Sequence, residues 1–345
     1  MSAWGSGSAR FLRSLMPQCT GLRPDWEWVV FTGPRVDPAV RNIPGWAEVH
    51  LQGRKLARRL IHETVRIPRE TLRRGFDFMV FPADVGPLVK SPPYAVFCRN
   101  PHVVPPDGVN PDGAARYRFQ RALLKKSCRR AAVTVTFTKT MSRGVTRILE
   151  VPIEKTRVLT PGSDHIKAKS SVVPAASLGV TGPYVLWVGV PYGHKNISGT
   201  LAAWERVRHQ EHGMKLVVAG LTQKDVDQAG GGGAGVVTGL GYVDPDSMAG
   251  LYSGASALLN ASLLESYGYP VAEALAAGLP IACSDIPPFR ELAPNASFFD
   301  PESPEDISRA ILAALKAPAV PRGNDYIRTW RECGEEFVRM IETAQ

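Results

Sequence analysis

Residues 260–285, NASLLESYGYPVAEALAAGLPIACSD, join an apolar strand pattern to an apolar helix pattern through a short polar turn. Pro270 fits the first turn of that helix, where a missing N–H leaves no hydrogen bond unmade. Gly278 is typical of a helix C-terminus, and a further strand pattern follows at 280–284. The stretch therefore predicts a strand, a helix and a strand in the order of an α/β sheet.

The same alternation continues on both sides of this stretch. Strand patterns fall into two series, at 27–33, 46–52, 76–82, 94–98 and 132–137, and at 184–190, 214–220, 235–243, 254–261, 280–284 and 296–300. Apolar strands that alternate with amphipathic helices predict parallel sheets covered on both faces. Two series predict an α/β protein of two doubly wound, Rossmann-like domains facing a cleft, with ligands at the carboxyl ends of the strands.

The domain boundaries follow from composition. We place the first domain at 1–165 and the second at 183–322, joined at 166–182 by a polar linker rich in Ser, Pro and Gly. A last helix in 323–345 is expected to pack back on the first domain. Doubly wound sheets have their first strand at the centre. Only residues 1–4 precede the glycine-rich start of the first helix, so we expect a short or missing first strand, or a natural start upstream.

Charge narrows the classes of partner. The chain has 345 residues and a net charge of +9, which suits polyanions such as phosphates, nucleotides, anionic lipid or nucleic acid. No RNA- or DNA-binding motif accompanies the charge, so nucleic acid is not expected. The chain contains no run of eighteen apolar residues, so no transmembrane helix is predicted. The N-terminus lacks the apolar core of a signal peptide, which indicates the cytoplasm.

The cysteines carry no metal-site or disulfide pattern. Five are scattered along the chain without a C-x-x-C pair, at Cys19, Cys98, Cys128, Cys283 and Cys333. An odd, scattered set favours a reducing compartment and argues against a disulfide framework or a zinc site.

Two carboxylates flank the turn of the opening stretch. Glu265 precedes the turn and Glu273 lies one turn into the helix. The start of a helix offers unpaired N–H groups and a positive dipole end, which suit a diphosphate, while carboxylates suit sugar hydroxyls. Taken alone, Glu265 would be a solvated turn residue and Glu273 an ordinary acidic residue of a first turn. Their combination favours a sugar nucleotide as the ligand.

The stretch resembles glycosyltransferase family 4, the retaining, metal-independent group 1 glycosyltransferases of GT-B architecture. The family pattern, E-x7-E with an aromatic-Gly-x-Pro core, is matched by Glu265, Tyr267, Gly268, Pro270 and Glu273. The resemblance covers nearly the whole chain. It extends through the segments AAGLPIACSDIPPFREL, LYSGASALL, FFDPESPEDISRAI, VLWVGVPYGHKNISGTLAAW, RVLTPGSD, CRNPHVVPP, FPADVGPL and GSGSARFLRSL.

The resemblance implies a role for individual residues. Glu265 would contact the transferred sugar and Lys195 would neutralise the diphosphate, so these two are the candidate catalytic residues. Glu273 would hold the ribose, and Arg99 and Asn100 would lie on the acceptor side. Further donor contacts are implied at Ser266, Tyr267, Gly268, Tyr269, Gly189, His194, Gly5 and Gly7. No metal or other cofactor is expected, because the helix end and the lysine would neutralise the diphosphate in place of a metal ion.

Two positions depart from the family pattern. Many members carry an arginine after the glycine that matches Gly189, and a second basic residue before the lysine that matches Lys195. This chain has Val190 and His194 there. One cation is missing, so stabilisation of the leaving group would be weaker unless Arg99 or another basic residue compensates.

The resemblance implies transfer of a hexose from a nucleoside-diphosphate sugar to a glycan, a glycolipid or a small molecule. The Lys195-Asn196 context resembles bacterial mannosyl- and rhamnosyltransferases. No carboxylate is expected opposite the leaving group, which favours front-side attack by the acceptor. A lipid-linked acceptor would bring the protein to the inner face of the cytoplasmic membrane as a peripheral protein. The alternative is a non-catalytic GT-B-like protein that binds a sugar nucleotide or a partner, and donor hydrolysis distinguishes the two.

Overall fold

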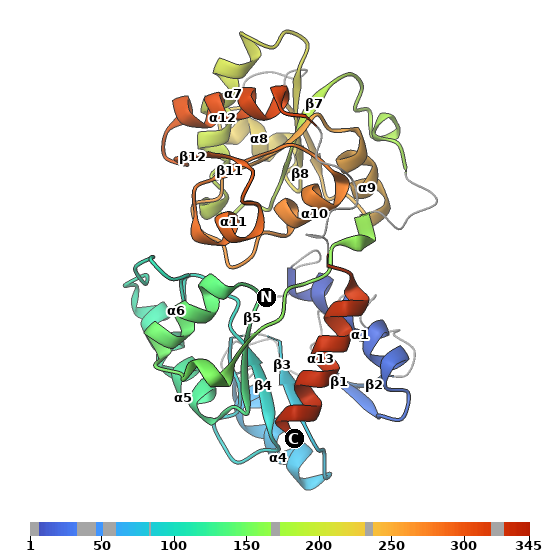
Figure 1. The fold of residues 1–345 in the computed structure, drawn as a ribbon, viewed down its shortest axis with the longest axis vertical. Helices are drawn as coiled ribbons and strands as arrows, with labels where there is room; N and C mark the ends of the chain where they lie inside the picture. The colour runs from blue at the N-terminus through green and yellow to red at the C-terminus, as the bar shows by residue number, and fades with distance from the viewer. Residues whose placement is uncertain are drawn as a thin grey trace. The chain divides into compact units, whose positions relative to one another are not determined.

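The chain folds into two compact units. The computed structural model describes residues 7–32, 46–50, 60–82, 84–166, 173–231, 237–318 and 328–345. One unit comprises Met1–Gly162 with Arg328–Gln345, and the other comprises Ser163–Ile327. Each unit holds parallel β-structure flanked by helices, as Figure 1 shows.

The second unit is built on a six-stranded parallel sheet. Its order is β12-β11-β10-β7-β8-β9. The chain runs outward from β7 to β9, returns to pair β10 with β7, and runs outward again to β12, so the winding reverses between β7 and β10. The strands are β7 Tyr184–Val188, β8 Lys215–Ala219, β9 Val237–Gly241, β10 Ala257–Asn260, β11 Ile281–Ser284 and β12 Ser297–Phe299.

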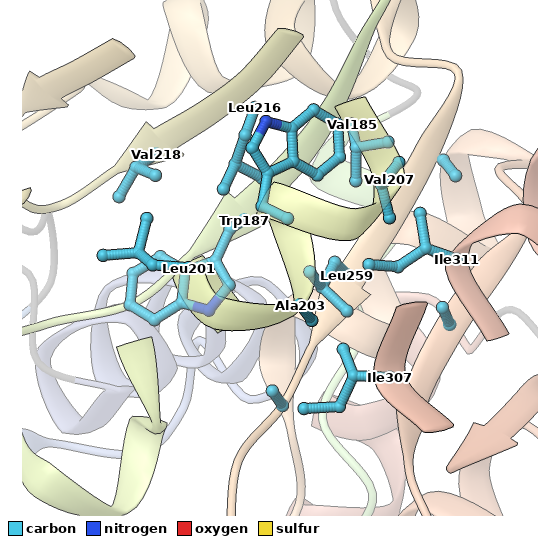
Figure 2. Packing of buried hydrophobic residues seen from close by; sticks show 14 of the residues in the cluster. Val185, Trp187, Leu201, Ala203, Val207, Leu216, Val218, Leu259, Ile307 and Ile311 are labelled. Carbon is cyan, nitrogen blue, oxygen red and sulfur yellow. The ribbon is translucent and has the colours of Figure 1, made fainter. Parts of the chain in front are cut away.

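Helices cover both faces of this sheet. They are α7 Ile197–Arg208, α8 Gln223–Gln228, α9 Pro245–Gly254, α10 Tyr269–Ala277, α11 Pro287–Leu292 and α12 Pro304–Lys316. Alternate residues of a strand point to opposite faces. In β7, Val185 and Trp187 therefore pack with α7, α8 and α12, while Tyr184 and Leu186 pack with α9, α10 and α11. Figure 2 shows Trp187 within the first of these clusters.

The first unit has two separate sheets in the described part of the chain. One pairs β1 Trp28–Thr32 with β2 Trp46–His50. The other is a four-stranded parallel sheet of β3 Met79–Phe81, β4 Tyr94–Phe97, β5 Val133–Thr136 and β6 Thr156–Val158. Strand β6 escaped the sequence analysis because three residues with a central arginine show no apolar pattern. The helices include η1 His62–Arg66, α4 Ile67–Arg73, α5 Ala115–Arg130, α6 Lys139–Leu149 and η2 Ile153–Lys155.

The first and last helices of the chain lie together in the first unit. Helix α13, Trp330–Ala344, packs along α1, Gly7–Leu22 (Figure 1). The ring of Trp330 lies 5.9 Å from that of Phe11. Gly334 allows the close approach, because a Cβ there would lie 2.7 Å from the Cβ of Gln18. Residues 1–6 lie outside the described residues, so the short or missing first strand stays a prediction and Gly5 is not placed.

The described part of the segment expected as a linker packs on the second unit. Ile166 ends the short helix η3, Asp164–Ile166, and is buried against α9 and α10. The helix η4, Ala175–Leu178, packs on α9, and Val180 is buried in the same cluster. These few apolar residues anchor a segment whose Ser, Pro and Gly content concealed them.

Candidate donor site at the sheet reversal

The loops after β7 and β10 leave the sheet side by side, at the point where the winding reverses. The two strands are parallel neighbours, with Trp187 beside Leu259. Open α/β sheets bind ligands at this point, because the two loops diverge there. The backbone N–H of Leu263, after β10, donates to the carbonyl of His194, after β7, at 2.7 Å. This bond fixes the spacing of the two loops.

The two candidate catalytic residues form an ion pair across these loops. The ammonium of Lys195 donates to Oε1 of Glu265, and the two side chains are only 15% and 12% exposed. The hydroxyl of Ser262 lies 3.0 Å from the same carboxylate oxygen. A pair so shielded from water is more strongly coupled than a surface pair. An incoming diphosphate would compete with Glu265 for the lysine.

The residue after Lys195 holds the loop in shape. Asn196 has a left-handed backbone, with φ +53° and ψ +46°, which few residues other than glycine adopt. Its side-chain oxygen accepts from the N–H of Gly199 at 3.2 Å, and its amide donates to the carbonyl of Pro301 at 2.6 Å. Such a cap offsets the backbone cost. The asparagine of the Lys-Asn signature thus positions Lys195 just before α7.

Close packing against the ring of Trp187 explains the glycine at position 189 of the same loop. A Cβ on Gly189 would lie 2.5 Å from the ring of Trp187, so no side chain fits there. Further along the loop, the ring of Tyr192 stacks on that of His194, with centroids 5.8 Å apart and planes 24° apart. Val190, where the family often has an arginine, is exposed. Gly189 and His194 therefore both lie in the loop next to Lys195.

The turn between β10 and α10 has the predicted form. Gly268 has φ +103° and comes directly before Tyr269 and Pro270, the first residues of α10. The ring of Tyr267 is buried and meets that of Tyr269 edge-on, with centroids 5.2 Å apart. Because its side chain is buried, Tyr267 can present only its backbone to a ligand. Ser266 lies beside it and is half-buried.

Glu273 is fully buried, unlike the exposed carboxylate of an ordinary first turn. Its Oε2 accepts from the hydroxyl of Tyr252 on α9 at 2.7 Å, and its Oε1 lies 3.2 Å from Nε2 of His165 on η3. Sequence reasoning missed both partners. Tyr252 lies within LYSGASALL, a segment noted for its resemblance, and His165 comes directly after another, RVLTPGSD, but no spacing linked them to Glu273.

The acceptor-side candidates lie at the carboxyl end of β4 in the first unit. The N–H groups of Arg99 and Asn100 donate to one carboxylate oxygen of Asp84 at 2.7 and 2.9 Å. Burial raises the pKa of Asp84, although these hydrogen bonds and the charge of Arg99 oppose the rise. The Arg99 guanidinium lies over the ring of Phe137, 4.8 Å from its centroid. Asp84, which orders this edge, was not singled out from the sequence.

Comparison with known proteins places this arrangement in a family. Residues 175–332 match the family model described as glycosyl transferases group 1. This part of the chain belongs to the group 1 glycosyltransferases. The matched residues of the group 1 domain include Lys195, Glu265 and Glu273, whereas Arg99 and His165 lie before it.

Two curated relatives of the chain are described as O-antigen chain mannosyltransferases. The chain is 27% identical to O-antigen chain mannosyltransferase B of Escherichia coli over 58% of this chain and 56% of the relative. It is 29% identical to O-antigen chain mannosyltransferase RfbU of Salmonella typhimurium over 63% of this chain and 61% of the relative. The chain thus spans little more than half the length of these two relatives.

Solved structures share the fold of both units. Sucrose-phosphate synthase from Thermosynechococcus elongatus superposes with a TM-score of 0.67 at 18% identity, over 95% of this chain and 87% of that one. WaaG, a glycosyltransferase involved in lipopolysaccharide biosynthesis, superposes with a TM-score of 0.66 at 15% identity, over 96% and 94%. At these identities the likeness shows the fold alone, which is the GT-B architecture of two Rossmann-like units. The narrower assignment to family 4 stays a prediction.

Proposed function

We propose that the chain is a retaining, metal-independent glycosyltransferase that moves a hexose from a nucleoside-diphosphate sugar to a glycan acceptor. The observation that carries the proposal is the shielded Lys195–Glu265 pair at the sheet reversal, beside the start of α10. That edge offers a cation and helix N–H groups for a diphosphate, and a carboxylate for sugar hydroxyls. The group 1 domain and the mannosyltransferase relatives support the same chemistry and favour mannose as the hexose.

The donor would bind by exchanging partners within the ion pair. Lys195 turns from Glu265 to the diphosphate, and Glu265 becomes free to accept from a hydroxyl of the sugar. The bond between the anomeric carbon and the diphosphate oxygen breaks as negative charge grows on the leaving group, which Lys195 and the start of α10 stabilise. The acceptor hydroxyl then bonds to the same face of the sugar and passes its proton to the leaving phosphate. Glu273 serves the ribose end of the donor.

The acceptor is assigned to the first unit, with Arg99 and Asn100 at the carboxyl end of β4. The names of the relatives support a glycan acceptor, and we extend this to a lipid-linked glycan at the inner face of the cytoplasmic membrane. Within the described residues no helix is long and apolar enough to cross a membrane. Contact with lipid would therefore be peripheral, as far as the described residues are concerned.

Helix α5 has the composition for such a contact. Its sixteen residues, ARYRFQRALLKKSCRR, contain seven Lys or Arg and no acidic residue. Phe119 is 60% exposed, between the exposed side chains of Arg118 and Ala122. Basic residues around an exposed aromatic ring suit anionic lipid headgroups and the acyl boundary beneath them. Phe119→Ser should weaken co-sedimentation with phosphatidylglycerol vesicles, whereas Ile153→Ser, at an equally apolar and 49% exposed position, should not.

The activity is tested with purified protein and GDP-mannose, with UDP-glucose and dTDP-rhamnose in parallel, in EDTA. We expect nucleoside diphosphate to be released slowly without acceptor and faster with a glycan acceptor. The anomeric configuration of the product, read by NMR, tests retention. Binding of a donor without hydrolysis or transfer would favour the non-catalytic alternative. Activity that EDTA abolishes would overturn metal independence.

A further inference from the structure

The hydroxyl of Ser262 lies between two acceptors, next to the Lys195–Glu265 pair. Its Oγ is 2.7 Å from Oδ1 of Asn260 and 3.0 Å from Oε1 of Glu265. Both distances suit an O–H···O hydrogen bond, but a serine hydroxyl has a single hydrogen to donate. Ser262 is only 1% exposed, so water does not compete for this hydrogen. The two acceptors must therefore receive it by turns.

Asn260 receives the hydrogen while Lys195 is bonded to Glu265. The backbone N–H of Ser262 also donates to Oδ1 of Asn260, at 3.2 Å, which identifies this atom as the oxygen of the amide, since a nitrogen there would face a donor. Two oxygens at 2.7 Å repel each other unless a hydrogen lies between them, so the hydroxyl points at Asn260. Oε1 of Glu265 accepts from the ammonium of Lys195 instead.

We infer that Ser262 is a positioning residue, whose hydroxyl turns from Asn260 to Glu265 when a nucleoside diphosphate draws Lys195 away. This inference rests on the proposed function. A shielded carboxylate that loses its cation is destabilised, and a hydrogen bond from a hydroxyl offsets part of that cost. The turn is a rotation about the Cβ–Oγ bond of Ser262. It moves only the hydrogen, which stays bonded to Oγ throughout.

The neutral amide of Asn260 makes this exchange easy. Asn260 ends β10 and is 4% exposed, and its oxygen keeps the N–H of Ser262 as a partner after the hydroxyl has turned. A carboxylate in its place would hold the hydroxyl by a stronger, charge-assisted bond. It would also set a second negative charge close to Glu265. An amide therefore suits a partner that has to release the hydroxyl.

The exchange links Ser262 to the affinity for the nucleotide through Glu265 alone. Among the described residues, Lys195 and Ser262 are the two hydrogen-bond partners of the Glu265 carboxylate. When the diphosphate takes Lys195, only the hydroxyl of Ser262 remains to stabilise the carboxylate charge. Loss of the hydroxyl should therefore weaken nucleotide binding when Glu265 is present, and have no effect when Glu265 is absent.

A double-mutant cycle, measured by calorimetric titration with GDP and in parallel with UDP and dTDP, tests the inference. Ser262→Ala should weaken binding of the nucleotide that the wild type prefers by about tenfold, the order expected for a hydrogen bond to a charged group. In a Glu265→Ala background, Ser262→Ala should change the affinity by less than about twofold. Ser262→Cys offers a weaker donor and should show an intermediate loss, and it provides the same test if the alanine variant does not fold.

The matched control is Ser308→Ala on α12, because Ser308 is also buried and its hydroxyl donates to the carbonyl of Glu305 at 2.8 Å. It should bind the nucleotides as the wild type does. An equal loss of affinity from Ser262→Ala with and without Glu265 would show that Ser262 only shapes the loop, and would overturn the inference. Unchanged or tighter binding in Ser262→Ala would overturn it as well, because the hydroxyl would then be idle. If the wild type binds none of the three nucleotides, the proposed donor site fails and the inference falls with it.

Discussion

Gly268 determines the geometry of the turn between β10 and α10, and replacing it with alanine tests that geometry. Its φ of +103° is a conformation that side chains resist, at a cost of about 1–3 kcal/mol. A Cβ there would also lie 3.2 Å from Cδ1 of Phe289 and closer still to Cε1. Overpacking a buried ring costs about 1–3 kcal/mol. Gly268→Ala should therefore destabilise the second unit by about 2–6 kcal/mol.

Two companion variants separate the backbone cost from the clash. Gly213 also has a positive φ, +83°, but a Cβ at this position would have no neighbouring atom within 4 Å. Gly213→Ala should thus show the backbone cost alone, about 1–3 kcal/mol. In a Phe289→Leu background, where the ring is gone, the free-energy cost of Gly268→Ala should fall to a similar value. Urea unfolding followed by circular dichroism measures these three changes in the free energy of unfolding.

Binding provides the functional half of the test. If the turn shapes the donor site, Gly268→Ala should weaken nucleoside diphosphate binding at a temperature where the variant is still folded, whereas Gly213→Ala should not. The reasoning is refuted if Gly268→Ala costs less than about 0.5 kcal/mol, the range of an ordinary surface substitution. An equal cost with and without the Phe289 ring would refute the clash alone.

Three further predictions concern charged groups. Lys195→Ala should lower kcat by roughly 30- to 1000-fold, because about 2–4 kcal/mol of leaving-group stabilisation is lost. The control Lys224→Ala, at an exposed lysine, should leave kcat unchanged. Unchanged turnover of Lys195→Ala at saturating donor would contradict the role of Lys195. In calorimetry, Glu273→Ala should weaken the binding of free nucleoside diphosphate. Glu265→Ala should leave that binding unchanged but abolish sugar transfer. Equal losses of binding affinity in the two variants would refute the division of roles. Burial raises the folded-state pKa of Asp84, so its contribution favours folding in acid and is lost as the pH rises through that raised pKa. Asp84→Asn should therefore gain stability relative to the wild type as the pH rises above about 4, the ordinary pKa of an aspartate. Thermal melts of the two proteins that keep a constant separation as the pH rises would exclude the effect.

Local patterns were sufficient for the elements and for the turn. Apolar runs predicted β7 and β10 because buried parallel strands need apolar side chains on both faces. Pro270 and Gly278 predicted the ends of α10, since the first residue lacks an N–H and the second tolerates φ +74°. These features depend only on neighbours in the chain, so the chain alone specifies them. Strand β6 is the exception, because its three residues are ordered by pairing with β5.

The partners of the site residues were decided by tertiary structure. Lys195 and Glu265 are 70 residues apart, and they meet because β7 and β10 become neighbours when the winding of the sheet reverses. His165 and Glu273 are 108 residues apart, and their contact depends on how η3 packs against α10. The sequence by itself determined which residue types stand at each turn. Only the packed sheet and helices decided which side chains are shielded from water and which groups they face, because burial and long-range contacts belong to the whole unit and to no segment of it.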